Sequence, residues 1–205
     1  MAYKNLFLRT FLSIIFILIY LSCLIINFNL VYYLIFLIYF LVFFEIFLYF
    51  KKYKILPMVY LIISLVFFLT IDFDNEIILG FNLFIFTVIT FDIFSYICGK
   101  TFGKNKITKI SPNKTLEGFF GGLSFSLFSS LLFAYYFDYH INFRIISFIL
   151  LIIIFAFIGD LIESFFKRKN DLKNSSEFIP GHGGVFDRFD SFLFSIIIYS
   201  VSISI

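Results

Sequence analysis

Long apolar runs dominate this sequence and leave few folds open to it. Each run has roughly 20 residues, the length that an α-helix needs to cross a bilayer core of about 30 Å. The runs are continuous, whereas a transmembrane β-barrel shows short segments of alternating hydrophobicity. Of the 205 residues, 61% are hydrophobic and 24% aromatic, which is unlike a soluble domain. The sequence therefore predicts an all-α integral membrane protein, built as a polytopic helical bundle.

Short polar segments divide the chain into about seven predicted transmembrane helices. We expect residues 1–76 to form the N-terminal spans, and residues 77–205 to form a second region with two long polar loops, 99–117 and 167–190. The last run is short for a complete crossing of the bilayer. The predicted spans are residues 6–27, 30–50, 57–70, 77–97, 118–136, 145–166 and 191–205.

The distribution of basic residues predicts the orientation of the chain. If the N-terminus is cytoplasmic, every one of the 16 Lys and Arg residues except Arg144 lies on the cytoplasmic side. The opposite orientation would reverse this bias, which the positive-inside rule disfavours. The first run is also too long for a removed signal peptide. We therefore expect a protein of the cell (inner) membrane, with both long polar loops facing the cytoplasm.

Ionisable residues are concentrated in one stretch, residues 159–191, between the last two apolar runs. Charge at the edge of a bilayer is costly and is usually kept because it binds or reacts with something. We therefore expect the functional site here. The ionisable residues of the stretch include Asp160, Glu163, Lys167, Arg168, Lys169, Lys173, His182, Asp187, Arg188 and Asp190.

The sixth predicted span carries a polar face near its cytoplasmic end. Asp160, Glu163, Ser164 and Lys167 have the spacing i, i+3, i+4, i+7, which places them on one side of a helix. Acids inside a membrane are usually functional, so Asp160 is a candidate catalytic residue. The structural alternative is that Asp160 pairs with a lysine from a neighbouring span and only holds the bundle together.

Two further acids, Asp187 and Asp190, precede the last apolar run at the spacing i, i+3. Asp190 alone could simply cap the last helix. Together with Asp160, however, the two carboxylates would suit Mg²⁺, which prefers oxygen ligands and is commonly held by carboxylates plus substrate phosphates. The sequence thus predicts a magnesium site made by Asp160, Asp187 and Asp190.

A glycine-containing segment, Gly181-His182-Gly183-Gly184, lies just before these acids. Glycine lets backbone N–H groups approach an anion closely, and such nests bind phosphate. Lys167 and Arg168 would add fixed positive charge. We expect this segment and these cations to bind phosphate groups.

The other long loop, residues 99–117, contains several lysines that an anionic lipid surface would attract. Ser111 and Lys114 flank Pro112 and lead into a glycine-bearing helix, which is more typical of a placed phosphate contact. Asp92, near the end of the preceding span, is a candidate polar lining residue. Carboxylates and cations of this kind are the equipment of phosphoryl or nucleotidyl transfer.

From Ser164 to Ser191, the residues S-F-F-K-R, Lys173 and I-P-G-H-G-G-V-F-D-R-F-D-S resemble the signature of the phosphatidate cytidylyltransferases, also called CDP-diacylglycerol synthases. Asp92, Gly99, F-G-K at 102–104 and S-P-x-K-T-x-E-G at 111–118 are similar to a second block of that family. The resemblance covers residues 92–191. One departure is Asn174, where the family pattern has Asp after the lysine.

The resemblance implies an Mg²⁺-dependent enzyme that makes CDP-diacylglycerol and pyrophosphate from CTP and phosphatidic acid. It implies catalytic roles for Asp160, Ser164, Asp187 and Asp190, and metal binding by the three aspartates. It also implies a homodimer in contact with membrane lipids, and no nucleic acid partner. The substrate-binding residues expected from pattern and resemblance are Ser111, Lys114, Lys167, Arg168, Lys173, Gly181, His182, Gly183, Gly184 and Arg188.

Three other functions remain open at this point. A CTP-dependent polyprenol or phytol kinase would share the phosphate-binding residues but would release CDP. A transporter or channel would use Asp160 to line a pathway, although charge gathered at one side argues against it. An inactive relative would keep the fold without the reaction, and Asn174 keeps this reading open.

Overall fold

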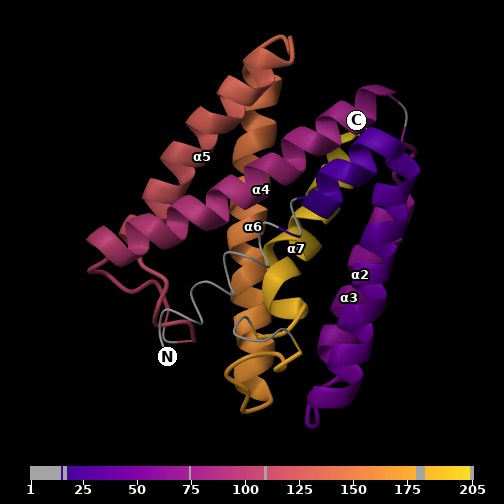
Figure 1. Cartoon of the computed structure of the whole chain (residues 1–205). Coiled ribbons are helices and arrows are strands. Elements are labelled where there is room, and N and C mark those ends of the chain that lie inside the picture. The colour runs from indigo at the N-terminus through magenta and orange to yellow at the C-terminus, as the bar shows by residue number, and fades with distance from the viewer. Residues whose placement is uncertain (1–14, 16–17, 74, 109, 179–182, 204–205) are drawn as a thin grey trace. The chain divides into compact units, whose positions relative to one another are not determined.

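The computed structural model describes residues 15, 18–73, 75–108, 110–178 and 183–203, and these residues form helices and connecting loops without a β-strand. This confirms the predicted all-α fold. Residues 18–26 are helical and precede six longer helices. The six are α2 (Phe28–Tyr49), α3 (Ile55–Leu69), α4 (Asn75–Phe102), α5 (Leu116–Tyr136), α6 (Phe143–Lys169) and α7 (Phe186–Ile203) (Figure 1).

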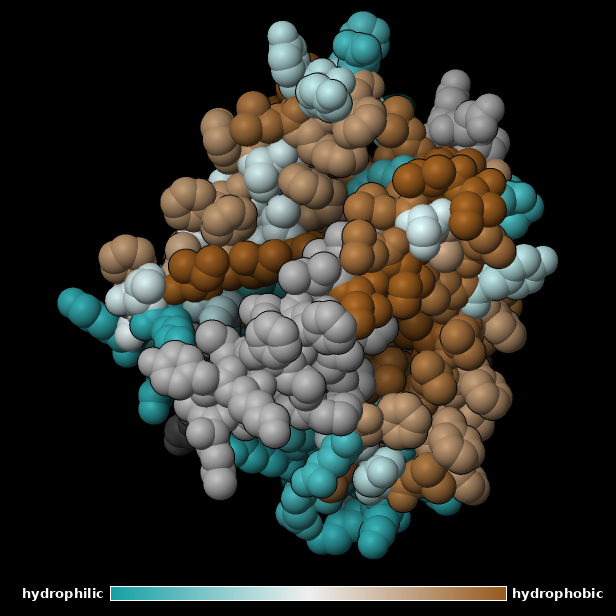
Figure 2. All heavy atoms as spheres, viewed as in Figure 1, coloured by the Kyte–Doolittle hydropathy of each residue, from teal (hydrophilic) through white to brown (hydrophobic). Residues whose placement is uncertain are grey.

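Four of these helices are long and apolar enough to cross a membrane, which supports an integral membrane protein. They are α2, α5, α6 and the part of α4 from Ile77 to Phe102. The α3 helix is apolar but shorter. On α2, large side chains such as Phe36, Phe40 and Phe47 are exposed, and Figure 2 shows mainly hydrophobic residues where α2 and α3 lie in Figure 1. Such a surface suits contact with lipid tails.

Two predicted helix boundaries are wrong. The last helix begins at Phe186, five residues before the predicted start, so Asp190 lies inside α7 and does not cap it. Apolarity alone set the predicted start, whereas the first turn of α7 is polar. Likewise, α4 continues to Phe102 and takes in the first residues of the predicted 99–117 loop.

The chain forms two compact units, each built from segments far apart in the sequence. The first unit contains residues 1–61 and 166–188, and the second contains residues 62–165 and 189–205. In the first unit, the ring of Tyr60 packs against those of Phe166 and Phe186, with centroids 5.6 and 6.4 Å away. In the second unit, the rings of Phe84 and Tyr199 pack with their centroids 4.8 Å apart.

Within the second unit, α5 presents a stripe of small residues to its neighbours. The buried residues of α5 recur every fourth position and are Gly118, Gly122, Ser126, Ser130 and Ala134. This is the small-xxx-small pattern that lets membrane helices approach closely. The approach here is to α4, with which α5 makes extensive contact.

The contacts of this stripe leave little room at the helix interface. A Cβ atom on Gly122 would lie 2.7 Å from Cβ of Ser95 and 3.0 Å from the ring of Phe91. Further along, the hydroxyl groups of Thr87 and Ser130 hydrogen-bond at 2.9 Å. Close packing and a polar contact therefore hold α4 and α5 together where the hydrophobic effect cannot.

A Gly122→Leu substitution should destabilise the second unit by about 1–3 kcal/mol, because the added side chain overpacks the interface between α4 and α5. Thermal unfolding of the purified protein in detergent measures the effect. The matched control is Phe128→Leu on the same helix, where the side chain is 63% exposed. Equal midpoints for the two variants would contradict the packing described here.

Candidate functional site

Three carboxylates meet in the second unit, two from α6 and one from α7. Asp160, Glu163 and Asp190 each offer one oxygen atom, and the three atoms lie within 4.8 Å of one another. The side chain of Glu163 is fully buried. Asp160 and Glu163 are one helical turn apart, so the predicted spacing does place them on one face of α6. We call these three residues the carboxylate cluster.

The carboxylate cluster exists because α6 and α7 approach closely at Gly159. A Cβ atom there would lie 2.6 Å from the carbonyl oxygen of Asp190 and 2.8 Å from Cβ of Phe194. A larger residue would separate the two helices and with them Asp160 and Asp190. The third helix of the site is α4, since the Ser191 hydroxyl donates to Asp92 Oδ1 at 2.9 Å. This contact brings Asp92, the predicted lining residue, to the same region.

Lys114 supplies positive charge to the cluster. Its Nζ atom forms an ion pair with Oδ2 of Asp160 and lies 5.4 Å from the ring centroid of Phe157. A turn places it there, because the Lys114 N–H donates to the Ser111 carbonyl at 3.1 Å, with Pro112 in the second position. Asp160 thus pairs with a lysine, as the structural alternative expected, but this lysine comes from the loop before α5 and not from a neighbouring span.

The loop that carries Lys114 is held by the start of α5. The Glu117 carboxylate accepts the backbone N–H groups of Lys104 at 3.0 Å and of Asn105 at 3.2 Å. Thr115 caps the helix and accepts the N–H of Gly118 at 3.1 Å. The loop is therefore folded onto α5.

The charges of this region are strongly unbalanced. Asp92, Asp160, Glu163 and Lys114 all lie close enough to Asp190 to act electrostatically on its carboxylate. Among the described residues that act on Asp190, counted together with it, four carboxylates thus accompany one ammonium group. Buried like charges are unfavourable unless a cation neutralises them. All the ligand atoms are oxygen, which suits a hard divalent cation such as Mg²⁺ or Ca²⁺.

Asp187 lies in the first unit and organises the segment before α7. It pairs with Nζ of Lys167 at 2.7 Å and accepts the backbone N–H groups of Ser175 at 3.0 Å and Gly184 at 2.9 Å. Gly183 has φ +87°, a conformation that favours glycine. These contacts account for Asp187 within the first unit. Its predicted role as a metal ligand stays a prediction.

The other predicted residues have varied surroundings. Ser164 is buried on α6, while Lys173 and Arg188 are exposed. The guanidinium group of Arg168 donates to the Leu172 carbonyl at 2.9 Å. Ser111 is half-buried at the start of the turn described above. Gly181 and His182 lie outside the described residues.

The first unit also contains a polar contact that the sequence did not indicate. Asn170, at the end of α6, accepts the backbone N–H groups of Lys52 at 3.0 Å and Tyr53 at 3.1 Å. Beside it, Lys52 pairs with Asp171, and this hydrogen bond raises the pKa of the Lys52 amine above its usual range. Both side chains of the pair are mostly exposed, so the pair contributes little to stability.

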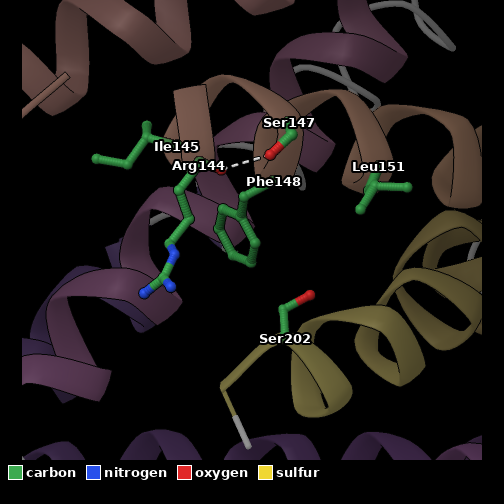
Figure 3. A pocket seen from close by; sticks show the side chains of 6 residues that line it. All are labelled: Arg144, Ile145, Ser147, Phe148, Leu151 and Ser202. Atoms are coloured by element: carbon green, nitrogen blue, oxygen red, sulfur yellow. Dashed lines mark hydrogen bonds between the residues drawn. The ribbon is translucent and has the colours of Figure 1, made fainter. Parts of the chain in front are cut away.

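A cavity of about 290 Å³ lies near the other end of α6 and is separate from the carboxylate cluster. Figure 3 shows Arg144 and Phe148 next to each other on α6, with Ser202 of α7 facing them. Arg144 and Asp160 are 16 positions apart on α6, a distance of about 24 Å along the helix axis. The described residues that line the cavity offer one basic group and no carboxylate, so they add nothing to the metal site.

Comparisons with known proteins show the family to which the chain belongs. Residues 7–205 match the sequence model of the cytidylyltransferase family, and the chain belongs to that family. The chain is similar to the phosphatidate cytidylyltransferase of Staphylococcus aureus, with 49% identity over 105 residues, which cover 50% of this chain and 40% of the relative. The enzyme of the same name from Staphylococcus epidermidis is 43% identical over 119 residues, 57% of this chain and 46% of the relative. Each alignment thus spans less than half of the relative's length.

Removing one acid of the cluster should weaken cation binding measurably. We expect Asp190→Asn and Glu163→Gln each to weaken Mn²⁺ binding by about tenfold or more, because each loses one charged ligand. Electron paramagnetic resonance of free Mn²⁺ during a titration provides the affinity. Asp138→Asn is the control, since Asp138 is exposed and its φ of +57° is one that asparagine also adopts. Equal affinities for all variants would contradict a metal site at the cluster.

Proposed function

We propose that this protein is a phosphatidate cytidylyltransferase that transfers CMP from CTP to phosphatidic acid. A phosphate oxygen of phosphatidic acid attacks the α-phosphorus of CTP, and the bond from that phosphorus to the bridging oxygen breaks. Pyrophosphate leaves with the electron pair, and CDP-diacylglycerol is the product. Such a transfer needs the charges of the reacting phosphates to be neutralised and their positions fixed.

One observation carries this proposal, namely the carboxylate cluster with Lys114 on its edge. An isolated ion pair would need one acid, whereas Asp160 shares its surroundings with Glu163 and Asp190. Membership of the cytidylyltransferase family supports the same chemistry, and the relatives' names point to phosphatidic acid as the acceptor.

We assign Mg²⁺ to Asp160, Glu163 and Asp190, whose close oxygen atoms fit a small hard cation. The family resemblance adds Asp187 of α7 as a further candidate ligand. When bound, Mg²⁺ would neutralise phosphate charge and polarise the phosphorus under attack. We also assign a catalytic role to Ser164, which is buried on α6 one position after Glu163 and would orient groups at the cluster.

Basic side chains and backbone N–H groups would bind the phosphates of the two substrates. Lys114 would exchange its contact with Asp160 for a phosphate oxygen once Mg²⁺ neutralises that acid. The residues to which we assign phosphate binding are Ser111, Lys114, Lys167, Arg168, Lys173, Gly181, His182, Gly183, Gly184 and Arg188.

The location follows from the substrates. Phosphatidic acid stays in the bilayer with its head group at the surface, while CTP arrives from the aqueous phase. We therefore place the reaction at the cytoplasmic face of the cell membrane, where the positive-inside bias puts residues 99–117 and 167–190. The family resemblance also leads us to propose a homodimer surrounded by membrane lipids.

The purified protein should release pyrophosphate when CTP, Mg²⁺ and phosphatidic acid are all present. Asp190→Asn should lower kcat by about 10²–10³-fold, the loss typical when one electrostatic contact to a transition state is removed. Arg144→Gln should match the parent, because Arg144 lies at the far end of α6.

The product separates this reaction from its rivals. Release of CDP in place of pyrophosphate would indicate a lipid kinase. No nucleotide turnover by a folded parent that still binds Mn²⁺ would indicate an inactive relative, and Asn174→Asp would then test whether the missing charge is responsible.

His182 should not act as a proton acceptor. The phosphate group of phosphatidic acid is largely a dianion near neutral pH, since its second pKa is about 6, so the nucleophile is already deprotonated. A His182→Gln enzyme should keep a rate within about threefold of the parent and an unchanged pH profile between pH 7 and 9. A large loss that varies with pH would assign a proton transfer to this histidine.

A further inference from the structure

Glu45 is a buried acid in an otherwise uncharged helix. It is the one charged residue of α2, and its side chain is 3% exposed. A carboxylate in such surroundings is strongly unfavourable unless other groups satisfy it. The contacts of the Glu45 side chain therefore indicate its role.

The Glu45 carboxylate binds the start of α7, which is 140 residues further along the chain. Its Oε2 atom accepts the backbone N–H of Val185 at 2.7 Å and that of Phe186 at 3.1 Å. Phe186 is the first residue of α7, and helix N-termini carry N–H groups that have no acceptor within the helix. An anion is also favoured there by the helix dipole. Glu45 thus caps the N-terminus of α7, a role that usually belongs to the residue just before the helix in the chain.

Gly184 makes this approach possible. A Cβ atom at position 184 would overlap both Oε1 of Glu45 and Oγ of Ser175. Glycine at this position is therefore required by the packing of Glu45, whether or not the residue contacts a phosphate. This observation is independent of the hydrogen bonds, because it depends on the space around the backbone.

Asp187 also holds the segment that Glu45 holds. Asp187 accepts the N–H groups of Ser175 and Gly184 and pairs with Lys167. Glu45 accepts the next two N–H groups, those of Val185 and Phe186. Two carboxylates from different helices therefore fix consecutive backbone positions from 184 to 186.

We propose that Glu45 is a positioning residue of the enzyme, which fixes the phosphate-binding segment before α7 through the backbone of Val185 and Phe186. This inference rests on the proposed function for its catalytic consequence, and on the hydrogen bonds alone for its structural part. Glu45 touches no reacting group in this role. It acts by holding the backbone that carries Asp187 and by stabilising the first turn of α7.

Hydrogen exchange of the backbone tests the structural part without any activity. In detergent-solubilised full-length protein, Glu45→Ala should speed exchange in a peptide covering residues 183–190 by about tenfold or more, because two N–H groups lose their acceptor. Glu45→Gln should speed it by about three- to tenfold, since a neutral acceptor makes a weaker hydrogen bond. Val42→Ala, a buried packing change on the same helix, should leave this peptide unchanged.

Kinetics test the functional part. Glu45→Ala should lower kcat/KM for CTP by about tenfold or more, and Glu45→Gln should recover most of that loss, because the amide oxygen restores an acceptor. Val42→Ala should keep the parental kcat/KM. If the alanine variant does not fold, Glu45→Gln decides the question by the exchange of the same peptide.

Two results would overturn the proposal. One is exchange at residues 183–190 that is unchanged in Glu45→Gln, and the other is an increase in Val42→Ala as large as in Glu45→Ala. If exchange is faster in the Glu45 variants but the parent protein is inactive, the structural role of Glu45 is supported and the proposed cytidylyltransferase activity is rejected. The two failures are therefore distinguishable.

Discussion

The close approach of three carboxylates, one of them fully buried, is the constraint on which the second unit depends. Asp160, Glu163 and Asp190 repel one another when they are charged. The unit offsets the repulsion with Lys114 and leaves room in the charge balance for a cation. The close contact at Gly159 is what makes the arrangement geometrically possible. A bundle held only by apolar contacts could avoid this cost by placing any uncharged residue at these positions.

The packing of α4 against α5 positions Asp92 and Lys114, the residues that these elements add to the carboxylate cluster. Lipid tails are as apolar as leucine, so membrane helices gain little free energy from burying large apolar residues. Close approach of their backbones has to supply the stabilisation instead. The small residues of α5 provide this approach along its whole length, beginning at Gly118. Gly118 packs against Gly99 and Ser95 of α4, one residue after Glu117, which holds the loop of Lys114. The packing of α4 against α5 therefore also fixes the position of the Lys114 ammonium group.

Six predicted spans correspond to the helices α2 to α7, because an apolar run of sufficient length forms a helix in a bilayer, while the predicted span 6–27 lies partly outside the described residues. The predicted start of α7 is too late because Asp187, Arg188 and Asp190 resemble a loop in composition, although they form the first turns of a helix. The i, i+3 spacing correctly placed Asp160 and Glu163 on one face of α6, and both Asp160 and Asp190 belong to the cluster that the structure forms. Glu163 was visible in the same pattern, but its importance appears only when its neighbours from α7 are known. The buried stripe of α5 is also visible in the sequence, where a small residue recurs at every fourth position.

Glu45 marks the limit of such prediction. A single acid in an apolar run is a signal that sequence reading can use, since charge in a membrane segment usually has a function. Its partners, however, are backbone N–H groups, which every residue except proline possesses and which no pattern of side chains identifies. The role of Gly184 is equally hard to predict from the sequence. A glycine before a helix suggests a phosphate-binding nest, yet the Cα of Gly184 lies against the Glu45 carboxylate. A nest that already holds an internal anion binds phosphate with its remaining N–H groups only. The backbone N–H groups of residues 184 to 186 already donate to Asp187 and Glu45, so the proposed function relies on side-chain cations more than on these N–H groups for phosphate binding.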